Sequence, residues 1–80
     1  MKNPAFDKKV GEWFKGYRKE HNLTQEQMGA CVGKTKEWYR EIERGRSSLL
    51  FADATKLCDA LGIDLNKMVK ELDSSEQVNK

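Results

Sequence analysis

Two short helical segments joined by a glycine turn constrain this chain more than any other feature of its sequence. The run TQEQ at residues 24–27 is a capping box, in which the Thr24 hydroxyl accepts from the backbone N–H of Gln27 and the Gln27 side chain reaches back. Gly33 is expected to end this helix, Thr35 to cap the next one, and Gly45 to end it. Helices this short are unstable alone in water, so each must bury an apolar face against the rest of the chain.

Apolar periodicity and stop signals predict five helices and no strand, which is an all-α fold. The first helix is expected over residues 7–21, the fourth over residues 50–61, and the fifth from residue 64 to residue 72. Asn22, Gly62 and Asp64 supply the stop and start signals of these helices. The expected inward-facing residues recur three and four apart: Val10, Phe14, Tyr17, Met28, Val32, Tyr39, Ile42, Phe51, Ala54, Leu57, Cys58, Leu61, Leu65, Met68 and Val69.

The 80 residues are therefore expected to form one helical domain over residues 7–72. Residues 1–6 form an N-terminal lead, and the polar residues 73–80 form a disordered tail. Gly29 lies one turn before Gly33, inside a helix, where glycine is unfavourable. A steep crossing of two helices needs a residue without a side chain at the contact, so we expect the second and third helices to meet at Gly29.

These signals occur together in a specific combination. The run LTQEQM at residues 23–28, Gly33, the ending IERG at residues 42–45 and the run KLCDALGI at residues 56–63 resemble the lambda-repressor-like helix-turn-helix family of Xre/Cro type. The resemblance covers residues 10–69 and implies a compact five-helix DNA-binding domain whose motif is formed by the second and third helices. The chain departs from the family pattern at several positions: Met28, Gly29, Lys34, Trp38, Tyr39, Leu49 and Leu50.

In such folds the second helix of the motif lies in the major groove of DNA. On the third helix of this chain, Lys36 or Arg40 can donate to guanine, and Glu37 or Glu41 can accept from a cytosine amino group. The alternative is a solvated helix face in which Glu37 pairs with Arg40. The expected contacts to phosphate, or to the ends of the site, come from residues that flank these positions: Gln25, Thr35, Arg44, Arg46 and Ser47.

The distribution of charge along the chain agrees with DNA binding by the second and third helices. Residues 8–46 hold ten Lys and Arg against six Asp and Glu, a local +4, whereas residues 51–80 hold four against six, a local −2. The family also implies a partly buried ion pair between Arg18 and Glu43. A homodimer on a two-fold operator is expected, and its interface should avoid the basic segment and use apolar residues further along the chain: Leu49, Leu50, Val69 and Leu72.

The function predicted is sequence-specific binding of double-stranded DNA by a transcriptional repressor of phage, mobile-element or restriction-modification controller type. The alternative is an antitoxin that binds both its operator and a toxin. An enzyme is not expected, because the chain has one histidine and no convergent set of acid, base or nucleophile. Cys31 and Cys58 show no metal-ligand spacing, so no metal, cofactor or small-molecule substrate is predicted. Without an apolar run of membrane-spanning length or a signal peptide, the expected location is the cytoplasm, away from membranes.

Overall fold

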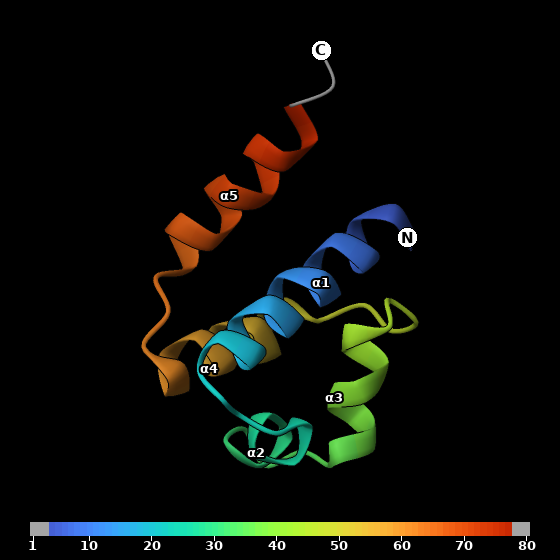
Figure 1. Ribbon diagram of the computed structural model, residues 1–80, viewed down its shortest axis with the longest axis vertical. Helices are drawn as coiled ribbons and strands as arrows, with labels where there is room; N and C mark the ends of the chain where they lie inside the picture. Colours follow the sequence, from blue (N-terminus) through green and yellow to red (C-terminus); the bar gives the residue numbers. More distant parts are fainter. Residues whose placement is uncertain (1–3, 78–80) are drawn as a thin grey trace.

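The computed structural model describes residues 4–77, with side chains as far as Asp73. Within this range it contains five α-helices and no strand: α1 (Pro4–Glu20), α2 (Gln25–Ala30), α3 (Lys36–Glu43), α4 (Phe51–Leu61) and α5 (Leu65–Gln77). The predicted all-α fold is confirmed. Figure 1 shows α1 in the middle of the molecule, with α2 and α3 on one side and α5 on the other. None of these helices combines the length and the apolar character that a membrane span requires.

The caps predicted from the sequence are present. The backbone N–H of Gln27 donates to the Thr24 hydroxyl at 3.0 Å, and the Thr24 N–H donates to the Gln27 side chain at 2.8 Å, which completes the capping box. The Thr35 hydroxyl accepts from the backbone N–H of Trp38, and Asp64 accepts at the start of α5. A left-handed backbone conformation follows each of the first four helices, as predicted, at Asn22, Gly33, Gly45 and Gly62.

One apolar core joins all five helices. Four side chains are completely buried there, one each from α1, α2, α3 and α4: Phe14, Met28, Tyr39 and Leu57. Met68 and Leu72 on α5 close the core from the other side, at 5% and 6% exposure. Because every helix contributes to the same cluster, the short helices α2 and α3 are held by packing rather than by their own propensity.

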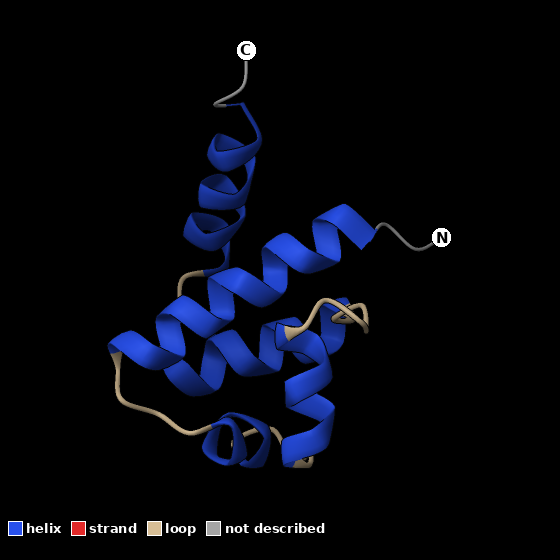
Figure 2. Ribbon diagram, turned by 45° about the vertical axis from the view of Figure 1, so that its right-hand side comes forward, coloured by secondary structure: helices blue, strands red, loops and turns tan. Residues whose placement is uncertain are grey.

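The first and third helices cross at a glycine for which the sequence alone predicts no role. Figure 2 shows α3 standing at a steep angle to α1. A Cβ atom on Gly11 would overlap the carbonyl oxygen of Ile42 and lie 2.7 Å from that of Glu43. The absence of a side chain at Gly11 therefore allows α1 to lie directly on the last turn of α3.

Gly29 also marks a close approach, as predicted, but its neighbour differs from the one expected. A Cβ atom there would lie 2.5 Å from the carbonyl oxygen of Thr35 and 3.0 Å from that of Lys34. The backbone N–H of Lys34 donates to the Gly29 carbonyl at 2.9 Å. The contact is therefore between α2 and the turn that enters α3, rather than between the axes of two crossing helices.

The first and last helices are each longer than the sequence predicts. The first helix begins at Pro4 rather than at residue 7, because a proline is well suited to the first helical turn. The last helix continues past Leu72 to Gln77, where a disordered tail is predicted. No glycine, proline or asparagine lies between Leu72 and Gln77, so no such signal stops the helix at Leu72. Residues 78–80 of that predicted tail lie outside the described residues.

Several apolar residues also differ from their predicted positions. Phe51, expected inward, is 75% exposed, and Val69 is 46% exposed. Phe51 is the first residue of α4, next to Leu50, which is also exposed. Helical periodicity cannot show which other element covers a residue at the first turn of a helix. Leu72, expected on a partner surface, instead packs in the core of the chain.

Candidate nucleic-acid interface

An open groove, here called the basic groove, lies between the C-terminal half of α1, the start of α2 and the outer face of α3. Six cationic side chains line it: Lys15, Arg18, Lys19, Lys36, Arg40 and Arg44. Two carboxylates, Glu26 and Glu43, also line it, and Glu43 is neutralised by an ion pair with Arg18. The excess of positive charge suits a polyanion.

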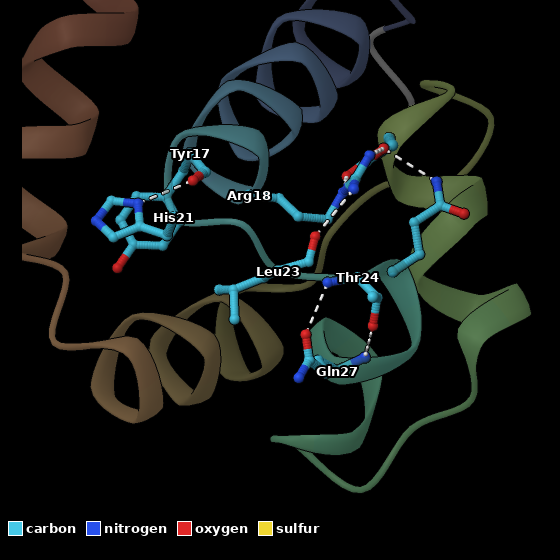
Figure 3. A network of polar contacts seen from close by, with 8 residues as sticks. Tyr17, Arg18, His21, Leu23, Thr24 and Gln27 are labelled. Carbon is cyan, nitrogen blue, oxygen red and sulfur yellow. Dashed lines mark hydrogen bonds and ion pairs between the residues drawn. The ribbon is translucent and has the colours of Figure 1, made fainter.

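The predicted ion pair between Arg18 and Glu43 is present at the floor of this groove. Arg18 Nε donates to Glu43 Oε2 at 2.6 Å, and Arg18 Nη2 donates to Glu43 Oε1 at 3.2 Å. The remaining Arg18 nitrogen, Nη1, donates to the carbonyl of Leu23 at 3.1 Å, as Figure 3 shows. Gln25 Nε2 donates to the same Glu43 carboxylate at 3.1 Å. One carboxylate thus connects α1, α2 and α3.

This network sets the charge state of its members. Burial raises the pKa of Glu43, but the hydrogen bonds from Arg18 and Gln25 and the positive charge of Arg18 outweigh burial and hold its pKa below the ordinary value of 4.5. The hydrogen bond to Glu43 raises the pKa of Arg18 above its ordinary value. Burial raises the pKa of the Tyr39 phenol far above its ordinary value of 10.0. The pair is therefore ionised and the phenol neutral at neutral pH.

The cationic residues of α3 and of its C-terminal cap, Arg44, form a single row. Lys36, Arg40 and Arg44 are four residues apart, which places them on one face of the helix, and all three line the basic groove. Lys36 is exposed, and Arg40 is half-buried with an Nε atom that has no hydrogen-bond partner in the described part of the chain. Glu37, beside this row, is exposed.

Glu41 is placed differently from the other predicted base readers. Its carboxylate lies 3.9 Å from Arg44 Nη1 and 3.8 Å from Arg46 Nη1. It does not line the basic groove, and instead it brings Arg44 and Arg46 together at the end of α3. A carboxylate in such a position orients two cations, a role that the sequence alone does not predict.

Other predicted contact residues lie around this face. Gln25 lines the basic groove, and its side-chain amide nitrogen donates a hydrogen bond to Glu43. Thr35 is exposed at the start of α3, and Ser47 is half-buried in the loop after it. Ser48, the next residue, donates to Asp7 at 2.8 Å and so fixes this loop to α1.

Two groove residues, Lys15 and Lys19, are missing from the contacts predicted from the sequence. They lie on α1, which is outside the two-helix motif, yet they face α3 across the basic groove. A signal for them exists in the spacing, because Lys15 follows Gly11 by four residues and therefore shares the face on which α1 meets α3.

Comparison with known proteins agrees with this geometry. The helix-turn-helix family model, of Cro/C1 type, matches residues 14–68, which include all of α2, α3 and α4. The chain is also similar to an uncharacterised HTH-type transcriptional regulator, y4dJ, of Sinorhizobium fredii (strain NBRC 101917 / NGR234). The two are 32% identical over 68 residues, covering 85% of this chain and 88% of the relative. No solved structure matches the chain significantly.

The family match spans more than half of the chain and includes every residue that lines the basic groove. The chain belongs to the helix-turn-helix family of Cro/C1 type.

Proposed function

We propose that this protein is a sequence-specific transcriptional regulator that binds double-stranded DNA with α3 in the major groove. The observation that carries the proposal is the row of Lys36, Arg40 and Arg44, which lines the basic groove on one face of α3. Of the two carboxylates in this groove, Glu43 is paired with Arg18, which leaves Glu26. The similarity to an HTH-type transcriptional regulator supports it. A recognition helix presents its first residues to base edges, which favours Lys36 and Glu37 for that role.

The other residues divide by position. Arg40, one turn further along the groove, is the second candidate for contact with guanine, because arginine donates in two directions to its major-groove edge. Lys15, Lys19, Arg44 and Arg46 are candidates for phosphate contacts, which position the protein without reading the sequence. Thr35, Gln25 and Ser47 extend this set at the edges of α2 and α3. Glu41 is an exposed ion-pair partner of Arg44 and Arg46, at 3.9 Å and 3.8 Å.

We further propose that this regulator is a repressor and that it acts as a two-fold homodimer. One recognition helix covers few base pairs, and a dimer places two of them about 34 Å apart, one DNA turn. Leu49, Leu50 and Val69 remain interface candidates, and the structure adds Phe6 and Phe51, which line an apolar hollow with Leu49 and Val69. None of these residues lines the basic groove, so pairing there leaves the groove open to DNA.

Binding to a random pool of duplex DNA, followed by selection and sequencing of bound molecules, tests the proposal. We expect enrichment of a two-fold symmetric sequence and a steep loss of affinity with added salt, because phosphate binding releases counterions. Failure to retain any duplex at low salt would rule out the proposed function.

A further inference from the structure

A second groove lies between α1 and α5. Its lining consists of Glu12, Trp13, Gly16, Tyr17, Glu20 and Glu71, and these six residues are here called the α1/α5 groove. It shares no residue with the basic groove. Neighbouring hollows that also contain Trp13 and Glu71 extend it in both directions along α5. This surface has no part in the proposed contacts with DNA.

The aromatic floor of the α1/α5 groove is held rigidly. The rings of Trp13 and Tyr17 stack with centroids 5.9 Å apart and planes 13° apart. Trp13 Nε1 donates to Glu71 at 2.8 Å, and the Tyr17 hydroxyl donates to the carbonyl of Leu61 at 3.1 Å. Both rings are thereby fixed before any partner arrives, which lowers the entropy lost on binding. Tryptophan and tyrosine are also among the residues that contribute most to protein–protein interfaces.

The rim of this groove is acidic. Glu12, Glu20 and Glu71 contribute three carboxylates, and no lysine or arginine is among the six lining residues. Lys67 and Lys9 line the hollows beyond the two ends of the groove, so the acidic character is confined to its middle. Glu12 and Glu20 are exposed and form no ion pair within the described part of the chain. They are separated by two turns of α1, about 12 Å along its axis. Such a rim repels nucleic acid and attracts a positively charged protein segment.

Gly16 lies midway between these two carboxylates, on the same face of α1. It is exposed, and a Cβ atom there would meet nothing within 4 Å. Glycine inside a helix is unfavourable, and at Gly11 the close contact with α3 explains it. Nothing in the described part of the chain explains Gly16. A close approach by the backbone of another molecule would account for it in the same way.

We propose that the α1/α5 groove binds a basic helix of a partner protein. Two lysine or arginine residues of that helix, two turns apart, pair with Glu12 and Glu20. Its backbone lies over Gly16, and its apolar side chains contact the rings of Trp13 and Tyr17. The surface lies apart from the basic groove, so the chain can bind this helix and a nucleic acid together.

The test uses the full chain labelled with 15N and an alanine-rich helical peptide that carries two lysines two turns apart. Addition of the peptide to millimolar concentration should shift the amide signals of Glu12–Tyr17 and Glu71 in NMR spectra. A peptide of the same sequence with glutamate in place of lysine should shift none of them. Equal shifts with both peptides, or no shift of these residues with the lysine peptide, would overturn the proposal.

Two variants keep the test specific to the groove. Gly16→Leu fills the gap on an exposed helix face, where the fold has room for a side chain, and should abolish the shifts caused by the lysine peptide. The double substitution Glu12→Gln and Glu20→Gln should weaken binding about fivefold through loss of two surface ion pairs. Asp59→Asn, which removes an exposed carboxylate on α4, is the matched control and should bind as the unmodified chain does. Unchanged peptide affinity in both groove variants would show that the peptide binds elsewhere.

Discussion

Arg18 on α1 and Glu43 at the end of α3 form a two-pronged ion pair whose shorter contact, Nε to Oε2, measures 2.6 Å. The two side chains are unequally buried, at 15% exposure for Arg18 and 4% for Glu43. Arg18 has a further partner in the Leu23 carbonyl, and Glu43 has one in Gln25. The pair is therefore the point at which three helices are fixed relative to one another.

Removal of the arginine should cost more stability than removal of the glutamate. Arg18→Ala leaves a nearly inaccessible carboxylate with one amide as its main partner, and we expect a loss of about 3 kcal/mol in the free energy of unfolding. Glu43→Ala leaves a guanidinium that still reaches solvent and the Leu23 carbonyl, so its cost should be smaller. Urea unfolding followed by circular dichroism measures both. A larger loss of stability for Glu43→Ala than for Arg18→Ala would show that the buried carboxylate does not depend on the arginine in this way.

Stability should fall with acid through Glu43. Its pKa in the folded chain lies below the ordinary value of 4.5, so the stabilisation is complete above pH 4.5 and is lost as pH falls through the folded pKa. The raised pKa of Arg18 gives stabilisation that persists throughout neutral and acidic pH, so it does not affect this range. Urea midpoints between pH 7 and pH 3 measure the effect. The chain with Glu43→Gln should show a shallower dependence, and an unchanged dependence would assign the effect to other carboxylates.

Substitutions on the DNA-facing side should separate base reading from phosphate binding. Lys36→Ala and Arg40→Ala should each lower discrimination between the selected sequence and random DNA by about 1–3 kcal/mol. Lys15→Ala and Arg46→Ala should weaken both kinds of DNA alike and reduce the salt slope by about one each. Fluorescence anisotropy over a series of salt concentrations measures these quantities. Equal losses on both DNAs for all four variants would remove Lys36 and Arg40 from the base-reading role.

Three glycines inside helices offer a matched test of packing. Gly11→Ala should destabilise the fold by at least about 2 kcal/mol, because its methyl group would overlap backbone carbonyls that cannot turn away. Gly29→Leu, against the carbonyls of Thr35 and Lys34, should unfold the domain or abolish DNA binding. Gly16→Ala should instead stabilise it by up to about 1 kcal/mol, since the position is open. Thermal unfolding by circular dichroism measures all three, and equal effects at Gly11 and Gly16 would contradict the described crossing.

The proposed dimer should depend on the exposed apolar residues at the start of α4. Leu50→Glu and Phe51→Glu should shift the chain from dimer to monomer in sedimentation experiments over a range of concentrations, with the helical signal retained. Leu72→Glu is the contrasting variant, because it places a charge in the core and should unfold the chain. A chain that remains monomeric even on a two-fold symmetric DNA site would rule out the dimer.

Local signals in the sequence predicted the short-range features of the fold accurately. The capping box at Thr24, the cap at Thr35 and the left-handed ends at Asn22 and Gly33 involve groups within a few residues of one another. Residue type and spacing alone therefore predict them. The Arg18–Glu43 pair was predicted only through family resemblance, because no local rule joins residues that are 25 positions apart.

Features that depend on how helices cover one another were predicted poorly. Phe51 fits the apolar stripe of α4 yet is exposed. Leu72 has charged neighbours on both sides in the sequence, but its side chain lies in the core. Lys15 and Lys19 join the basic groove because α1 crosses α3 at Gly11, a relationship between distant segments. Periodicity describes the faces of one helix, and it does not say which neighbour each face meets.

The network around Glu43 has a consequence for how this protein can evolve. Lys36 and Glu37 are exposed at the start of α3 and contact no other side chain by a hydrogen bond or ion pair among the described residues. The residues that hold α3 in place are Tyr39, Ile42 and Glu43, which are buried against the other helices. Mutations at Lys36 and Glu37 can therefore accumulate without loss of folding. New binding preferences can arise on this scaffold by drift at its surface, while its interior stays under purifying selection.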